Sequence, residues 1–281
     1  MTSESEFIAA LRGLPLHPGA RGLEDDCAHI ENLIVTHDTM AEGTHFRAEA
    51  DMADVAWKLV AVNLSDLAAK GAEPVGVLLS YCLGHEDQRF LDGLTEALET
   101  FHVPLLGGDT VRTTGPRIFG MTAMGRVAHL PTPLRSGAKP GDAIYVTGML
   151  GRAMLGFEGD PGHIEAYNRP RPLLREGREL ARQANAMMDV SDGLLLDAFR
   201  MASASNRTFA IDSSSVPVAA PDRRDECLRW GDDYQLLFTI RDGLEPSVPA
   251  SRIGTVLDRS EALLILDGDP ITSADGLGYQ H

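Results

Sequence analysis

Aspartate residues recur where the sequence predicts that a strand or a helix begins or ends. These positions are Asp25 and Asp26 before a strand, Asp38 after the strand 33–36, Asp66 three residues beyond Asn63 on a helix, Asp109 after a Gly-Gly turn, and Asp189 and Asp192 around a helix start. A single aspartate at such a place is most often a cap or turn residue. Ligand sites of α/β proteins gather at these ends, so the joint pattern favours a cation site. Mg²⁺ suits carboxylate oxygens and is commonly shared with phosphate groups.

Two glycine-containing segments could bind phosphate. Ser191-Asp192-Gly193 opens the helix predicted over 191–204, where unpaired backbone N–H groups attract anions, although Ser191 could serve as an N-cap alone. Gly107-Gly108 would let the backbone approach a phosphate closely, or would simply form a tight turn. The sequence has no P-loop or GxGxxG motif, which disfavours the common nucleotide-binding loops. Aspartates alone would repel ATP, whereas several Mg²⁺ ions would turn them into a polyphosphate site.

Composition excludes several other classes of function. Lys plus Arg number 25 and Asp plus Glu number 41, giving a net charge of −16 without any basic run, so we expect no nucleic-acid partner. No apolar run approaches the ~20 residues of a membrane span, and the N-terminal sequence does not look like a signal peptide. The three cysteines form no CxxC pair, which is typical of a reducing compartment, and we expect the cytoplasm.

The alternation of predicted elements indicates two mixed α/β halves of α+β character. Helices are predicted over 3–12, from the N-cap Asp51 to Gly71, and over 87–101, 171–185 and 191–204; strands are predicted over 33–36, 75–82, 104–106, 117–127, 143–147, 187–190, 208–212, 234–240, 252–257 and 263–266. The segment 129–141 is rich in Pro and Gly and is the best candidate linker. We therefore expect one domain over 1–134 and a second over 135–281.

Seven segments, in order along the chain, match a known family. They are EDDCAHI (24–30), THDTMAEGTHF (36–46), WKLVAVNLSDLAAKGAEP (57–74), LLGGDTVR (105–112), RSGAKPGDAIYVTGMLG (135–151), MDVSDGLLLDAF (188–199) and GDDYQLLFT (231–239). With them the chain resembles the thiamine-monophosphate kinases, which belong to the superfamily of aminoimidazole-ribonucleotide synthetase and selenophosphate synthetase. The combination of NLSDLAAKGA, GGDT and SDGL is specific to this superfamily.

The resemblance implies two α/β domains, with ATP and several Mg²⁺ ions in the cleft between them, and a homodimer formed through the N-terminal halves. It implies direct transfer of the γ-phosphoryl group of ATP to thiamine monophosphate, giving thiamine diphosphate and ADP. It implies metal ligands at Asp26, Thr36, Asp38, Asp66, Asp109, Asp189 and Asp192. It implies ATP contacts at Gly108, Asp109, Arg135 and Ser191, substrate contacts at His45, Asp232 and Tyr279, and catalytic roles for Asp66, Asp109 and Asp192.

Three positions depart from the family pattern. Glu24 stands where a glycine is common, His37 where a hydroxyl residue is common, and Asp232 where the family has the longer glutamate. These departures affect the acceptor site more than the ATP site. They leave two alternatives open: a related enzyme with another acceptor, and a nucleotide-binding protein without catalytic activity.

Overall fold

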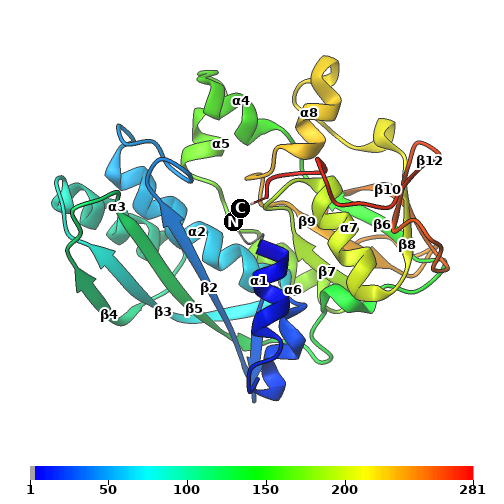
Figure 1. The fold of residues 1–281 in the computed structure, drawn as a ribbon, viewed down its shortest axis with the longest axis horizontal. Coiled ribbons are helices and arrows are strands. Elements are labelled where there is room, and N and C mark those ends of the chain that lie inside the picture. Colours follow the sequence, from blue (N-terminus) through cyan, green and yellow to red (C-terminus); the bar gives the residue numbers. More distant parts are fainter. Residues whose placement is uncertain (1–3, 281) are drawn as a thin grey trace.

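The computed structural model describes residues 4–280 and builds them around two β-sheets, seen in the left and right parts of Figure 1. The strands are β1 (Ala28–Ile30), β2 (Leu33–Ala41), β3 (Ala72–Cys82), β4 (Leu105–Val111), β5 (Ile118–Val127), β6 (Ala143–Thr147), β7 (Ala186–Asp189), β8 (Thr208–Ile211), β9 (Leu236–Ile240), β10 (Ala250–Leu257), β11 (Leu264–Leu266) and β12 (Asp269–Ile271). The helices are α1 (Glu4–Leu11), α2 (Met52–Ala69), α3 (Asp87–Thr100), α4 (Arg152–Glu158), α5 (Ile164–Asn168), α6 (Leu174–Leu180), α7 (Leu194–Ser205) and α8 (Arg224–Arg229). None of these described helices is both long and apolar enough to cross a bilayer.

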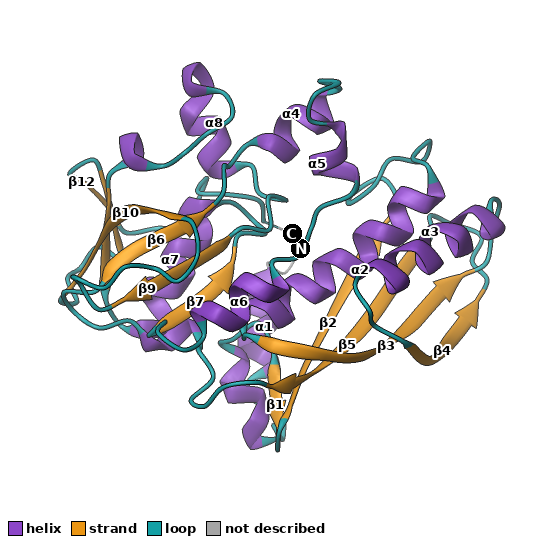
Figure 2. Ribbon diagram, turned by 180° about the vertical axis from the view of Figure 1, so that it is seen from behind, coloured by secondary structure: helices purple, strands orange, loops and turns teal. Residues whose placement is uncertain are grey.

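The first sheet has the strand order β1-β2-β5-β3-β4 and is covered by helices on one face only. Strands β3 and β4 are parallel, and the other neighbours are antiparallel. Helices α2 and α3 lie side by side across one face (Figure 2). The alternation of side chains along β3 fits this arrangement, because Val77 is buried in the core beneath α2 whereas Leu78 is 38% exposed.

The second sheet has the order β12-β11-β8-β10-β6-β9-β7, and its strands β6, β9 and β7 are buried on both faces. Only β8 and β11 run parallel. Ile144 and Val146 of β6 face a core that includes α7. Tyr145, between them, stacks on Phe238 in a second core that includes residues of α6 and the end of α2. The continuous apolar sequence of β6 is therefore explained by burial on both sides.

Helix α2 is the element that joins the two halves. Asp51 caps its N-terminus by accepting a hydrogen bond from Ala53 N at 2.9 Å, and Gly71, with φ +58°, follows its C-terminus. All of its 18 residues except Asp54 and Asp66 are buried. Its first turns pack under the first sheet, and its last residues, Ala68 and Ala69, enter a core of the second half.

The open face of the first sheet and its edge strand β4 are exposed. All seven residues of β4 are exposed. On the face opposite α2, the register places Leu78 beside Gly107 and Thr122, and Ser80 beside Asp109 and Gly120. No described helix covers this face, which therefore presents a mixed apolar and polar sheet surface.

Two strand predictions ended too early. Strand β2 continues to Ala41, because all nine of its residues pair with β5, so Asp38 lies inside the strand rather than after it. Strand β4 includes Gly108 and Asp109, which pair with β3 in parallel register instead of forming a turn. Propensity disfavours glycine in strands, but the pairing with β3 outweighs it here.

Two helix predictions were too long. The helix predicted over 171–185 is limited to α6. Helix α7 begins at Leu194 with Gly193 as its N-cap residue, so Ser191 and Asp192 precede the helix and the prediction that they open it is wrong. Gly193 has φ +111°, a conformation that a residue with a side chain rarely adopts, and this fixes the direction of the chain as it leaves β7.

Candidate functional site

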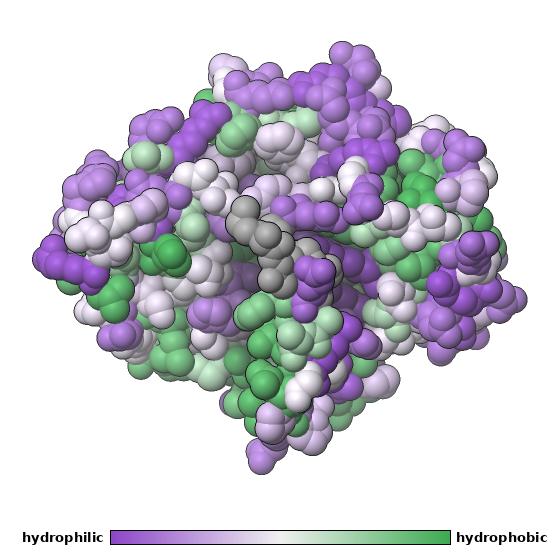
Figure 3. All heavy atoms as spheres, viewed as in Figure 1, coloured by the Kyte–Doolittle hydropathy of each residue, from purple (hydrophilic) through white to green (hydrophobic). Residues whose placement is uncertain are grey.

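A cleft of about 1480 Å³ lies between the two halves, beside α1. The face of the molecule in Figure 3 is hollowed near its centre at this place. The predicted residues that line it are Asp26, Asp38, His45, Asp66, Arg135, Asp189, Ser191, Asp192, Asp232 and Tyr279. Pockets for one drug-sized ligand measure about 300–1,000 Å³, so this cleft has room for two substrates.

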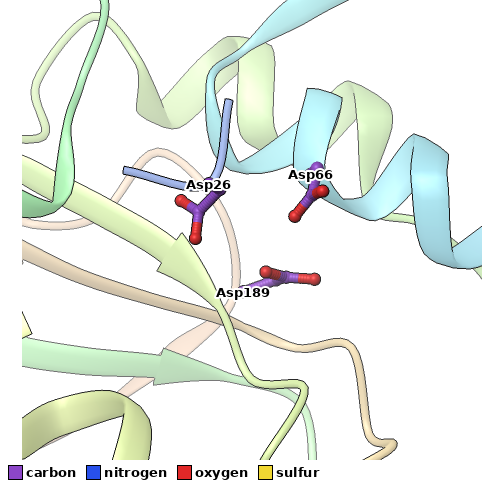
Figure 4. Close-up of side chains that lie close together, drawn as sticks. All are labelled: Asp26, Asp66 and Asp189. Carbon is purple, nitrogen blue, oxygen red and sulfur yellow. The ribbon is translucent and has the colours of Figure 1, made fainter. Parts of the chain in front are cut away.

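Three carboxylates meet at the floor of the cleft. Asp26, Asp66 and Asp189 each offer an oxygen that lies within 4.8 Å of the others. They come from the loop before β1, from α2 and from the end of β7, and they point toward one another (Figure 4). The structure thus brings Asp189 to residues that precede it by 123 and 163 positions in the sequence.

Burial and neighbouring charges raise the pKa of two members of this cluster, Asp66 and Asp189. Burial first, and then the charges of Asp38, Asp189 and Asp26, raise the pKa of Asp66 well above its ordinary value. Burial and the charge of Asp26 raise the pKa of Asp189 to about 7. A bound cation would offset the repulsion between such carboxylates and favour their ionised form.

A divalent cation fits this donor set. The donors are hard carboxylate oxygens from three elements, and Thr36 adds a hydroxyl that donates to Asp66 Oδ2. Oxygen-only donors of this kind are typical of Mg²⁺ sites, which often include one or more substrate phosphates. The structure therefore supports the expectation that this region holds metal, and the number of ions stays a prediction.

Two basic residues partly neutralise the rim of the cluster. The Nζ atom of Lys70, at the C-terminal end of α2, lies 2.5 Å from Asp25 Oδ1 and 2.5 Å from Asp26 Oδ2. Arg135 binds Asp26 Oδ1, with its Nε atom at 2.6 Å. Asp25 and Asp26 thus sit between a lysine from the first half and an arginine from the second.

Helix α2 also orients the neighbouring acidic residues. Asn63 Oδ1 accepts a hydrogen bond from the backbone N of Asp38 at 3.0 Å. Ser65 donates to Asp189 Oδ2 at 2.5 Å. Helix α2 thus carries one predicted ligand, Asp66, and forms hydrogen bonds with three others, Thr36, Asp38 and Asp189.

The segment before α7 binds a carboxylate of its own chain. Asp197 Oδ2 accepts hydrogen bonds from the backbone N atoms of Ser191 and Asp192, at 3.0 and 3.1 Å. Arg200 pairs with Asp192 and Asp197, and burial raises the pKa of Asp197 to about 8. The expectation that these N–H groups are unpaired and ready for phosphate is wrong, because Asp197 already occupies them.

The opposite end of the cleft combines aromatic rings with one ion pair. Lys58 Nζ donates to Asp232 Oδ2 at 2.7 Å and lies 3.9 Å from the centre of the Tyr167 ring. Tyr234 donates to Asp232 Oδ1 at 2.9 Å. Tyr279 belongs to the same cleft.

Two predicted residues lie elsewhere. Gly108 and Asp109 stand on the exposed strand β4 and do not line the cleft. His37 does line the cleft, and its ring contacts Thr122 Oγ1 of the first sheet at 2.9 Å. Glu24 lies 3.9 Å from Arg12 at the cleft edge.

Sequence reasoning missed four residues of the site: Lys58, Ser65, Lys70 and Asp197. The chain has only three lysines, and two of them, Lys58 and Lys70, are buried on α2. A buried charge is rare without a partner, so lysines inside an apolar helix were an available signal. Their partners could not be read from the pattern.

Comparison with known proteins agrees with the geometry. The family models for the N-terminal and C-terminal domains of AIR synthase related protein match residues 24–127 and 139–265. The thiamine-monophosphate kinase of Escherichia coli (strain K12) is 36% identical over 304 residues, covering 92% of this chain and 91% of that protein. The chain belongs to the thiamine-monophosphate kinase family.

Solved structures of the family share the whole fold. A structure described as AaThiL complexed with AMPPCP and TMP has a TM-score of 0.87 and 26% identity, covering 99% of this chain and 97% of that one. The thiamine-monophosphate kinase of Stenotrophomonas maltophilia K279a has a TM-score of 0.77 and 32% identity, covering 94% of this chain and 96% of that one. The expected fold of two AIR-synthase-related parts is confirmed.

Proposed function

We propose that this protein transfers the γ-phosphoryl group of ATP to the phosphate of thiamine monophosphate, forming thiamine diphosphate and ADP. The observation that carries the proposal is the cluster of Asp26, Asp66 and Asp189 at the floor of a cleft large enough for two substrates. The two substrates follow from the similarity to the thiamine-monophosphate kinase of Escherichia coli and to the structure of AaThiL complexed with AMPPCP and TMP.

The reaction needs no general base. An oxygen of the acceptor phosphate attacks the γ-phosphorus, and the bond from that phosphorus to the β–γ bridging oxygen breaks, leaving its electron pair on ADP. A phosphate monoester has a second pKa near 6, so its oxygens are largely deprotonated at neutral pH. What the site must supply is alignment and neutralisation of negative charge.

The metal site would consist of carboxylates from both halves. We assign Asp26, Asp66 and Asp189 as its central ligands, with Thr36, Asp38 and Asp192 nearby. Bound Mg²⁺ would neutralise the phosphate oxygens of ATP. Arg135 and Ser191 are assigned to ATP, and His45, Asp232 and Tyr279 to the acceptor end. Of these residues, Asp66 and Asp192 keep the catalytic role expected for them.

The position of Asp109 supports a homodimer as the active form. Gly108 and Asp109 are expected at the ATP site, yet they stand on an exposed strand outside the cleft of their own chain. A two-fold partner packed on the open face of the first sheet would bring this strand of one subunit toward the cleft of the other. We assign Gly108 and Asp109 to the partner's site.

We also propose that the protein acts in the cytoplasm. We propose one domain over 1–134 and a second over 135–281.

A direct assay tests the activity. Purified protein is incubated with thiamine monophosphate, ATP and Mg²⁺, and thiamine diphosphate and ADP are quantified by chromatography, with EDTA as the metal-free control. We expect the two products in equal amounts, and only with all three components. ADP formed without thiamine diphosphate would point to another acceptor, and ATP binding without ADP formation would indicate a non-catalytic protein.

Asp66→Asn tests the metal assignment. We expect turnover to fall by at least about 10³-fold while folding is retained, because the variant removes a ligand and also a source of repulsion in the cluster. Asp92→Asn, on the exposed face of α3, is the matched control and should keep normal turnover. Near-normal activity of Asp66→Asn would contradict the assignment.

A further inference from the structure

Lys58 carries a buried ammonium group to which the proposed mechanism has so far given no role. Its side chain is only 5% exposed, Lys58 lines the cleft, and its Nζ atom lies 2.7 Å from Asp232 Oδ2 at the acceptor end. We propose that Lys58 binds the phosphate group of thiamine monophosphate, and that Asp232 also positions Lys58. The proposal rests on the function proposed above and deepens it by naming a phosphate-binding residue.

The hydrogen bonds of Asp232 support its role in positioning Lys58. Its Oδ1 atom accepts from Tyr234 and its Oδ2 atom accepts from Lys58, at 2.9 and 2.7 Å. Both carboxylate oxygens are therefore engaged with the protein. The backbone of Asp232, at φ +57°, is held in a conformation unusual for a residue with a side chain. A carboxylate fixed in this way is suited to hold a cation in place.

Lys58 has donor capacity to spare. An ammonium group carries three N–H donors. Among residues 4–280, the hydrogen bonds of Lys58 reach Asp232 alone, and the Tyr167 ring lies against the ammonium at 3.9 Å. The face of an aromatic ring stabilises a cation without using a directed N–H bond. Donors thus remain for an anion in the cleft.

The place of Lys58 along α2 suits the phosphate of the acceptor. Lys58, Val62 and Asp66 are spaced by four residues, so they share one side of the helix, and all three line the cleft. Eight residues of helix span about 12 Å. The transferring phosphoryl group, held at the carboxylate cluster, and the acceptor phosphate can occupy this interval one after the other.

The other cationic side chains of the cleft contact groups outside its acceptor end. Among the described lining residues these are Arg12, Arg135 and Arg200. Arg135 binds Asp26, Arg200 binds Asp192 and Asp197, and Arg12 donates to the carbonyl oxygens of Gly22 and Leu23. Lys58 is the cation at the end of the cleft where Asp232 and Tyr167 lie.

The ion pair between Lys58 and Asp232 also links the two halves, so the experiment must separate binding from a purely structural role. We compare thiamine monophosphate with thiamine, which lacks the phosphate, by calorimetric titration in the presence of AMPPCP and Mg²⁺. For Lys58→Met we expect affinity for thiamine monophosphate to fall about 10- to 100-fold, the range for one charge-assisted hydrogen bond. Affinity for thiamine should change less than about threefold.

Controls and kinetics complete the test. Lys139→Met removes an exposed lysine outside the cleft and should leave both affinities unchanged. In steady-state assays, Lys58→Met should raise KM for thiamine monophosphate while KM for ATP stays within about twofold. Lys58→Gln, which keeps a donor for Asp232, provides the same comparison if the methionine variant does not fold.

The outcomes are distinct. Equal loss of affinity for thiamine and thiamine monophosphate would show that Lys58 only supports the structure, and unchanged affinity for both would show that it plays no part; either result overturns the proposal. If the unmodified enzyme neither binds nor phosphorylates thiamine monophosphate, the proposed function itself fails. If the unmodified enzyme is active and the variant keeps its preference for the phosphorylated acceptor, only the role of Lys58 fails.

Discussion

At the residue scale, the site is organised by lysine and aspartate side chains that are removed from water. Lys70 has no exposed side-chain surface. Burial lowers the pKa of Lys70, but the carboxylates of Asp26 and Asp25 outweigh it and raise that pKa above its ordinary value. The ammonium therefore stays charged and acts as a permanent cation beside the predicted metal ligands.

Removal of this charge should make the fold dependent on added metal. In Lys70→Met, two buried carboxylates lose a shared counter-ion, and we expect the free energy of unfolding in EDTA to fall by about 3 kcal/mol. Added Mg²⁺ should restore part of the loss by binding the same carboxylates. Thermal unfolding of the variant, the parent protein and Lys139→Met, each with EDTA and with Mg²⁺, measures this. Equal Mg²⁺ stabilisation of all three proteins would contradict the prediction.

Asp233 should make stability depend on pH. Burial raises its pKa from 3.8 to about 7, although the backbone N–H groups of Gly151 and Ala153 lower it. The native state therefore binds the proton more tightly than the unfolded chain. The stability from this group is full below about pH 4 and is lost as the pH rises through about 7.

Asp233→Asn removes this titration. We expect the stability advantage of the parent protein over the variant to shrink by up to about 4 kcal/mol between pH 4 and pH 8. Urea unfolding at several pH values measures the difference, and other titrating groups cancel because both proteins contain them. Asp92→Asn is the surface control. A difference that does not change with pH would refute the shifted pKa.

The sequence predicted the acidic residues of the site better than their partners. Asp26, Asp66 and Asp189 stand at element ends, so their position carries information about the fold. Lys58 lies 174 residues from Asp232, and Lys70 lies 45 from Asp25. No local pattern encodes these pairs, because they form only when α2 docks against both halves.

At the element scale, α2 matters because it belongs to two hydrophobic cores. Its C-terminal turn passes very close to α6: a Cβ atom built on Gly177 would lie 2.0 Å from the carbonyl oxygen of Ala68. Only glycine permits this approach. Most helices and strands could be predicted from periodicity, whereas the ends of β2 and β4 could not, since strand pairing rather than local propensity sets them.

Gly177→Ala tests this contact. Alanine normally stabilises a helix by up to about 1 kcal/mol relative to glycine. Here we expect the opposite sign, a loss of about 1–3 kcal/mol, because the added methyl group forces α6 away from α2. Chemical denaturation measures the change. Gly115→Ala, where the new Cβ would meet only Thr113 Oγ1 at 3.9 Å, should be neutral, and a stabilised Gly177→Ala variant would contradict the packing.

At the scale of the whole molecule, the shared site of a dimer can be tested by mixing subunits. Asp66→Asn damages the site of its own chain, whereas Asp109→Asn damages the partner's site if the dimer proposal is correct. Each variant alone should be inactive. Random mixing by co-refolding should restore about a quarter of the normal activity, because half of the dimers are mixed and each mixed dimer keeps one intact site.

Two results would oppose the shared site. Activity that stays absent in the mixture, with mixed dimers demonstrated by mass spectrometry, would place Asp109 in its own chain's site or outside the mechanism. A monomer by light scattering with full activity would exclude the dimer as a requirement. The parent protein taken through the same refolding is the control.

Because α2 packs into a hydrophobic core of each half, it also limits how far the two halves can move apart. A hinge motion that separated the two halves would remove Ala68 and Ala69 from their packing with Leu180. This would expose apolar surface to water, which is unfavourable. The packing of α2 therefore fixes the width of the cleft entrance. We therefore expect substrates to enter and products to leave through small local movements at the cleft edge, where α1 and Tyr279 lie, without a large domain motion.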